Sequence, residues 1–187
     1  MGCSSELMAA TSEMSDLARN KSNGWMDHEF LALQICELER RLFNINQRSA
    51  NIPVTFSEGS DLKERVGLCL MDPNSTRAKL LILTAEARRQ AALVFLYTCV
   101  KGLSLAHNTV QARVTNCLLC ITSVISLMEE RDSPIWGMTP IIWPLFVAGA
   151  SAITEEARYK VADYFCLLRR TKCLGASLIS HHPLHVS

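Results

Sequence analysis

The sequence predicts an all-α protein, an irregular multi-helix bundle with one central buried helix. Three observations lead to this fold class. Hydrophobic residues make up 49% of the 187 residues and charged residues 20%, so one domain can bury a substantial core. Aromatic residues account for only 6%, and the composition is rich in residues that favour helices over strands. Apolar residues also recur three and four positions apart over several long segments, which is the period of an amphipathic helix.

Residues 1–24 are expected to form a disordered leader before a helical domain at residues 25–175. The segment is rich in Ser, Met and Ala and closes with a polar cluster at 19–24, which is typical of a linker. It starts with Met-Gly-Cys-Ser-Ser, as a myristoylation signal does, but Glu6 stands where that signal has Ser or Thr. Lipidation is therefore not expected. Without a secretory signal peptide, the cysteines are expected to be reduced.

The first helix of the domain is predicted after Trp25, with Asp27 as its N-cap. Glu37 is expected to pair with Arg41 on the outer face, because residues four apart are neighbours on a helix. A loop is expected over residues 47–60 and a short helix over residues 61–70. The inward face of the first helix has residues at four-three-four spacing, namely Leu31, Ile35, Leu38 and Leu42.

The central helix is predicted over residues 76–101, because no Pro or Gly interrupts this segment before Gly102 provides a stop. Its second half, residues 91–100, is apolar on nearly all sides and has to be covered by other helices. The next helix is expected to be capped by Asn108. It carries the clearest apolar stripe in the sequence, namely Val110, Val114, Cys117, Leu118, Ile121, Val124, Ile125 and Met128.

Two further helices are predicted towards the C-terminus. Pro144 suits a first helical turn, where no N–H is needed, so residues 143–152 are expected to form a short, wholly buried helix. Thr154 then caps a last helix that ends at Gly175, and residues 176–187 form a flexible tail. The core face of the last helix is expected to contain Ala157, Val161, Tyr164, Phe165 and Leu168.

A membrane span is the alternative for the uncharged stretch at residues 133–154. Three Pro and two Gly interrupt this stretch. Its strongly apolar part, residues 141–150, is too short to cross about 30 Å of hydrocarbon. A buried helix without membrane contact is therefore expected.

Cys117 and Cys120 form a C-x-x-C motif, which occurs in zinc and redox sites. The motif lies in the middle of a helical stripe without a second ligand pair nearby in the sequence, so both residues are expected to be small buried thiols. The other cysteines are expected to be small apolar fillers. A string of His181, His182 and His185 could bind a metal, but a flexible tail does not hold its ligands in place.

The usual enzyme signatures are absent from the sequence, so neither catalysis nor a cofactor is expected. Lys and Arg number 19 against 18 Asp and Glu, which gives a net charge of +1. Non-specific binding to nucleic acid needs a clustered excess of basic residues. Direct nucleic-acid binding by this chain is therefore not expected.

Three segments resemble a known family. Residues 143–149 read Trp-Pro-Leu-Phe-Val-Ala-Gly and resemble the W-P-L-F-x-A-G signature of the fungal-specific transcription factor domain. That domain is the helical regulatory region behind the binuclear zinc cluster of many fungal regulators. Residues 86–97 resemble the family's R-x-A-A-L-x-Y-L helix, and residues 25–38 resemble its early helix. As a family signature in the structural core, the resemblance singles out Trp143, Pro144, Leu145, Phe146, Ala148 and Gly149, with Trp143 and Phe146 expected to be core anchors.

The chain departs from the family pattern in two places. Ala150 and Ser151 stand where the family often has Cys-Glu, and the cysteines do not form the two C-x2-C-x6-C runs of the zinc cluster. The resemblance therefore implies a nuclear, transcription-regulator-like protein without its own DNA-reading module. It would control a fungal metabolic gene set through protein partners or self-association, using apolar surface left uncovered beside residues 110–128. The alternatives are a helical protein-binding or scaffold module unrelated to transcription and, third, an enzyme on the same scaffold.

Overall fold

A computed structural model of the chain describes residues 5–25, 27–45, 76–129 and 139–170. These residues form helices and short connections without a strand, which confirms the all-α prediction. The π-helix η2 (Leu96–Val100) continues α4, and the 3-10 turn η4 (Thr139–Ile141) precedes α6. The α-helices are α1 (Ser5–Ser22), α2 (His28–Asn44), α4 (Thr76–Phe95), α5 (Asn108–Glu129), α6 (Ile142–Ser151) and α7 (Glu155–Arg170).

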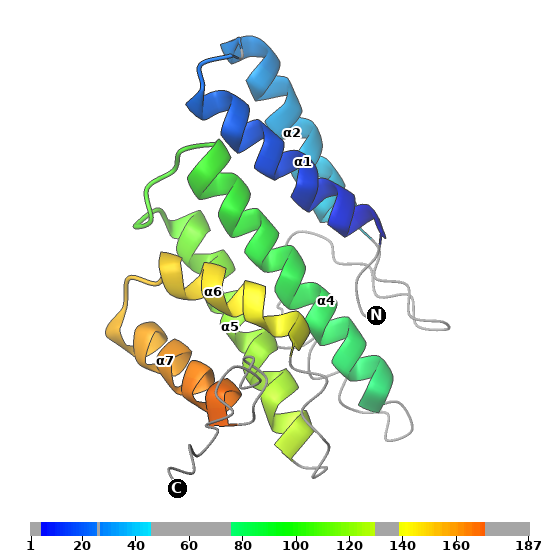
Figure 1. The fold of residues 1–187 in the computed structure, drawn as a ribbon, viewed down its shortest axis with the longest axis vertical. Coiled ribbons are helices and arrows are strands. Elements are labelled where there is room, and N and C mark those ends of the chain that lie inside the picture. Colours follow the sequence, from blue (N-terminus) through cyan, green and yellow to red (C-terminus); the bar gives the residue numbers. More distant parts are fainter. Residues whose placement is uncertain (1–4, 26, 46–75, 130–138, 171–187) are drawn as a thin grey trace, which may run out of the picture.

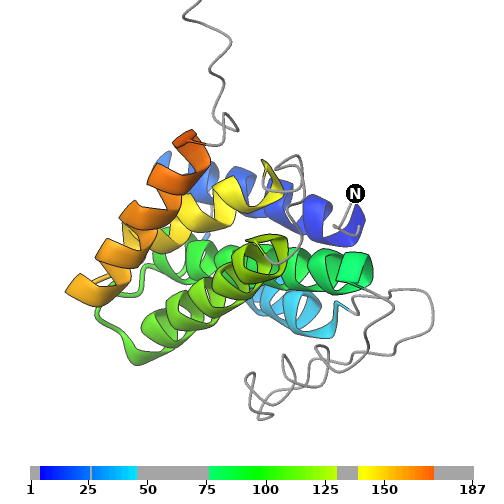
Figure 2. The same cartoon turned by 90° about the horizontal axis from the view of Figure 1, so that it is seen from below.

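Helix α4 is the centre of the bundle, as predicted. It packs against α1, α2, α5 and α6, whereas α7 packs against α5 and α6 (Figure 1). Seen from below, α1 and α6 lie on one side of α4 and α2 lies on the other (Figure 2). Its apolar end is enclosed by these neighbours, so that the following side chains are buried: Ala91, Ala92, Leu93, Val94, Leu96, Tyr97 and Val100.

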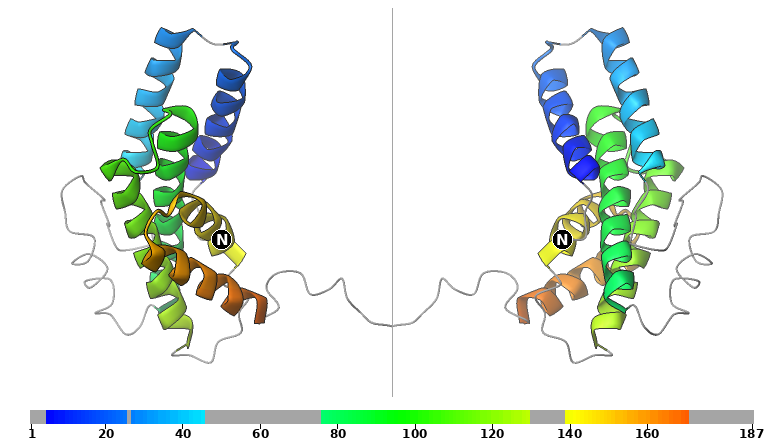
Figure 3. Two further views of the ribbon diagram at one scale, coloured as in Figure 1. Left: turned by 90° about the vertical axis from the view of Figure 1, so that its left-hand side faces the viewer. Right: turned by 90° about the vertical axis from the view of Figure 1, so that its right-hand side faces the viewer.

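The expectation of a disordered leader over residues 1–24 was wrong for Ser5–Ser22. This segment forms α1, which runs antiparallel to α2 (Figure 3). Its apolar residues have the three-four-three spacing of a helix face, which the abundance of Ser and Met in the segment obscured. The buried side chains of this face are Leu7, Ala10, Met14 and Leu17.

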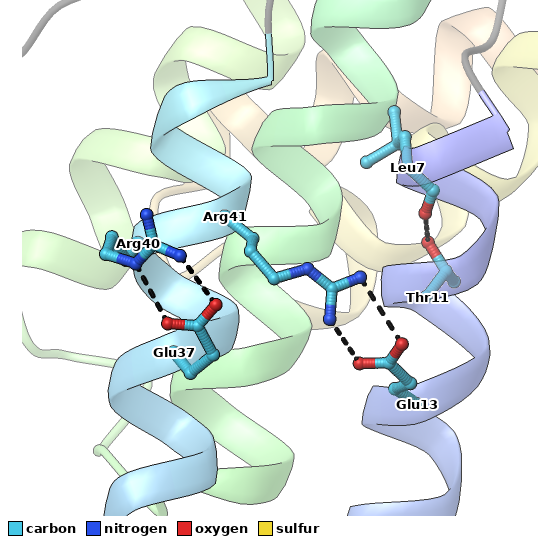
Figure 4. A network of polar contacts seen from close by, with 6 residues as sticks. All are labelled: Leu7, Thr11, Glu13, Glu37, Arg40 and Arg41. Atoms are coloured by element: carbon cyan, nitrogen blue, oxygen red, sulfur yellow. Dashed lines mark hydrogen bonds and ion pairs between the residues drawn. The ribbon is translucent and has the colours of Figure 1, made fainter.

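Helix α2 has the predicted N-cap position at Asp27 and buries the predicted Leu31, Ile35, Leu38 and Leu42, although no side-chain capping bond forms. The predicted pair between Glu37 and Arg41 was wrong. Glu37 instead accepts two hydrogen bonds from Arg40, and Arg41 reaches across to Glu13 on α1, with nitrogen–oxygen distances of 2.6 and 3.3 Å (Figure 4). The Arg41 side chain thus joins the two helices of the hairpin.

Two glycines with positive φ end helices in the described residues. Gly24 (φ 68°) follows α1, where the Trp25 N–H donates to the carbonyl of Asn20. Gly102 (φ 78°) ends the long helix as predicted. Beside it, the Lys21 Nζ donates to the Val100 carbonyl at 2.7 Å, so the end of α1 is attached to the end of η2.

Helix α5 buries its whole predicted stripe. The predicted cap at Asn108 was wrong, because Asn108 is already helical and His107 Nδ1 accepts the Thr109 N–H at 3.2 Å. By length and composition α5 could cross a membrane, but its apolar side chains are packed in the core of the bundle. No large hydrophobic side chain of α5 itself is exposed, and the uncovered apolar area expected beside residues 110–128 stays a prediction.

Helices α6 and α7 occur where the sequence predicts them, and Thr154 caps α7 by accepting the Ala157 N–H at 3.3 Å. Val161 and Leu168 are buried as predicted, while the other three predicted core residues of α7 are partly buried. The description of α6 as wholly buried was wrong, since Phe146 is 63% exposed. The predicted loop at 47–60, the helix at 61–70, Gly175 and the tail at 176–187 lie outside the described residues.

Candidate functional site

The two segments that carry the strongest resemblance, on α4 and α6, pack against each other. Cys117 of α5 lies where they meet. Its Sγ is 3.4 Å from the Ala87 carbonyl oxygen of α4 and 3.7 Å from the Pro144 carbonyl oxygen of α6. Motifs that are far apart in the sequence thus form one layer of the core.

The signature on α6 is partly a packing device. Pro144 is the third residue of the helix, where its missing N–H leaves no bond unmade, and Leu145 and Ala148 are fully buried. Gly149 lies against α7: a Cβ atom at this position would come within 2.7 Å of Val161 Cγ1. Only glycine therefore permits this close approach of the two helices.

The aromatic residues of the signature do not both serve the core. The expectation that Phe146 is a core anchor was wrong, because it points to the surface and is 63% exposed. Trp143 is partly buried and packs on the edge of the core. The four consecutive apolar residues 145–148 cannot all face inward on one helix, and the sequence alone does not show which of them face outward.

Trp143 also lines an open pocket of about 260 Å³ at the junction of α1, α4 and α6. Leu7, Met8 and Thr11 come from α1, and Arg88 comes from α4. The Thr11 hydroxyl donates to the Leu7 carbonyl at 2.8 Å (Figure 4), and its oxygen can still accept a hydrogen bond. Sequence analysis missed this pocket, because its α1 wall was expected to be disordered.

Arg88 is the charged residue of the pocket. Its Nε donates to the Pro140 carbonyl at 2.9 Å, and its Nη1 lies 3.5 Å from Met8 Sδ. None of the ion pairs among the described residues includes Arg88. The pocket therefore combines apolar walls with a cation that has no carboxylate partner in this part of the chain.

The next residue of α4, Arg89, has the opposite environment. It is 3% exposed and donates to both carboxylate oxygens of Glu86, at 2.8 and 2.7 Å, and to the Leu42 carbonyl at 3.2 Å. Gln90 Nε2 donates to the same carboxylate at 2.6 Å. This buried network supports the core and leaves Arg88 as the arginine that faces the pocket.

The comparison with protein families decides what kind of domain this is. The family model described as the fungal specific transcription factor domain matches residues 1–177. The chain belongs to this family. No curated protein and no solved structure shows a significant match to this chain. The family is a transcription factor domain rather than an enzyme family, and its match includes α1.

In this family domain, Cys117 and Cys120 are buried thiols, as predicted from the C-x-x-C position within a helix. Burial raises the pKa of both thiols, and the nearby negative charge of Glu86 adds to the shift. The description of the other cysteines as apolar fillers was wrong for Cys36, Cys99 and Cys166, which are exposed.

Metal ligands do not gather in the described part of the domain. No group of three or more His, Cys, Asp or Glu side chains there could hold a metal ion. The string of His181, His182 and His185 lies outside the described residues. The pocket beside Trp143 is therefore the candidate site that the structure offers.

Proposed function

We propose that this fungal specific transcription factor domain acts in the nucleus as a regulatory module that works through protein contacts. The family match over residues 1–177 carries the proposal. The net charge of +1 supports protein contacts over contacts with DNA, because phosphate binding needs a local excess of cations. A fungal metabolic gene set is the proposed target of this regulation.

Exposed apolar side chains on α2 are the proposed contact surface. Phe30 is 51% exposed and Leu33 is 65% exposed, and residues three apart are neighbours on a helix surface. Trp25, just before α2, is 78% exposed. Aromatic side chains are enriched at protein interfaces, so Trp25 and Phe30 are the proposed anchors and Leu33 adds apolar area beside them. A second copy of the chain or a separate regulator would cover them.

A tethering experiment tests the transcriptional role. The chain is fused to an unrelated DNA-binding domain, and expression of a reporter gene with the matching site is measured in fungal cells. We expect reporter expression to change, and the double variant Phe30→Ser/Leu33→Ser to weaken this change. Tyr159→Ser, which alters an exposed aromatic residue on α7, is the matched control and should retain the effect.

The DNA arm of the test uses the purified, unfused chain. A gel shift should detect no tight complex with duplex DNA, and size-exclusion chromatography will show whether copies associate. Tight, sequence-specific DNA binding would contradict the proposal, as would a nuclear fusion that leaves the reporter unchanged.

A further inference from the structure

The pocket between α1, α4 and α6 has the composition of a small-molecule site. Such sites are concave and mostly apolar, with a few polar groups that fix the orientation of the ligand. Here Leu7, Met8 and Trp143 supply the apolar walls, and Arg88 supplies the polar anchor. The volume of about 260 Å³ is below the roughly 300–1,000 Å³ typical of drug-sized ligands, so the ligand has to be small.

Arg88 determines the charge of the ligand. A guanidinium group has five N–H donors, of which the structure engages Nε with the Pro140 carbonyl and one donor with the weak thioether acceptor of Met8. The remaining donors have no partner among the described residues and can form charge-assisted bonds with a carboxylate, whose two oxygens match the guanidinium fork. The neighbouring Arg89 forms such a two-bond contact within the chain, with the carboxylate of Glu86.

We propose that this pocket binds a small organic carboxylate. The carboxylate group lies on Arg88, and the apolar part of the ligand lies against Trp143 and Leu7. Because the walls come from three helices, the ligand holds α1 against α4 and α6. Binding does not depend on the transcriptional role proposed above, so either proposal can fail without the other.

The test uses phenylacetate as the probe and phenylacetamide as its neutral isostere. Isothermal titration calorimetry on the full chain should show saturable one-to-one binding of phenylacetate. Binding of phenylacetamide should be weaker by at least about tenfold, because the amide cannot form the charge-assisted pair with Arg88.

Met8 offers a matched pair of variants. Its Sδ lies 3.5 Å from Arg88 Nη1 and its side chain is 52% exposed, so polar replacements are compatible with folding. Met8→Glu places a carboxylate of the chain beside Arg88 and should weaken phenylacetate binding at least about tenfold. Met8→Gln has the same shape without the charge, so it shows how much of the loss comes from replacing the thioether alone, and it should weaken binding much less than Met8→Glu. Circular dichroism checks that both variants keep the helical content of the wild type.

Arg88→Gln removes the anchor directly and should abolish the preference for phenylacetate over phenylacetamide. Since Arg88 also holds the Pro140 carbonyl, the Met8 pair decides the question if Arg88→Gln fails to fold. Three results would each overturn the proposal: no binding of phenylacetate at millimolar concentration, equal binding of the two probes, or equal binding by Met8→Glu and Met8→Gln.

Discussion

Glu86 and Arg89 form an ion pair one helical turn apart in the centre of the protein, with Arg89 Nη2 at 2.7 Å from Glu86 Oε1. Both side chains are almost completely buried, at 2% and 4% exposure. Burying two charges is costly, and the pair compensates this cost only while both partners and their further hydrogen bonds are present. Replacing only one of the two residues by an apolar side chain would leave the charge of the other buried without this pair. The packing around α4 therefore depends on both residues.

Removal of the Glu86 charge should strongly destabilise the domain. Glu86→Gln removes the carboxylate charge that pairs with the buried Arg89, which costs about 3–5 kcal/mol of unfolding free energy. Urea unfolding followed by circular dichroism measures the change. Glu37→Gln is the control, because Glu37 and Arg40 form an exposed ion pair whose loss should leave the unfolding midpoint nearly unchanged. Equal effects of the two substitutions would contradict this account of α4.

The contact between Gly149 and Val161 predicts a reciprocal packing effect. Gly149→Ala adds a Cβ that meets Val161 Cγ1 at 2.7 Å, and overpacking of this kind costs about 1–3 kcal/mol. Val161→Ala removes the clashing methyl groups. In a double-mutant cycle, the losses of unfolding free energy in the two single variants should therefore sum to more than the loss in Gly149→Ala/Val161→Ala. Additive losses would show that α6 and α7 do not approach closely here.

Neighbouring residues of the family signature should differ sharply in their effect on stability. Leu145 is fully buried, so Leu145→Ala should cost about 2–5 kcal/mol. Phe146 is largely exposed, and Phe146→Ala should change stability by no more than about 0.5 kcal/mol. Thermal denaturation of both variants checks the contrast. A large loss in Phe146→Ala would place its ring in the core.

The buried thiols predict a loss of stability at alkaline pH. Burial raises the pKa of Cys117 and Cys120 in the folded state, so above about pH 8.5 the unfolded chain ionises these thiols while the folded chain does not. Below that pH the stabilisation is fully present. Above it, the unfolding free energy should fall by up to about 1.4 kcal/mol per pH unit for each thiol.

Urea titrations between pH 8 and 10 measure this slope. The variant Cys117→Ala/Cys120→Ala should lose most of it, whereas Cys36→Ala/Cys99→Ala, which changes two exposed thiols, should keep it. A slope that follows the exposed pair instead would contradict the assignment of the titration to the core.

Much of the fold follows from the sequence, because several helices have strong apolar periodicity. The stripe on α5 and the inward face of α2 were predicted residue by residue, and α4 was predicted with its stop at Gly102. Helix α1 was missed because its composition resembles a linker, although Leu7 and Met14 keep the period of a helix. At this end of the chain the periodicity of the apolar residues, and not the composition, indicates the helix.

The site could not be predicted in the same way. Its walls come from α1, α4 and α6, and no local pattern tells Arg88, which faces the pocket, from Arg89, which is buried with Glu86. The orientation of Phe146 could not be predicted either, because on a short, uniformly apolar helix the sequence does not show which side lies outward. Pairings such as Arg41 with Glu13 depend on how the helices pack.

The bond between Lys21 and Val100 can form only after the chain between these residues has been synthesised. These two residues are 79 positions apart. At about 5–20 residues per second, the ribosome makes that length in roughly 4–16 s. Helix α4 is made only late in this interval. Until then α1 and α2 have no α4 to pack on, so the apolar side chains that they bury against it stay open to water or to a chaperone. The newly made hairpin of α1 and α2 consequently exposes apolar surface until the rest of the bundle emerges.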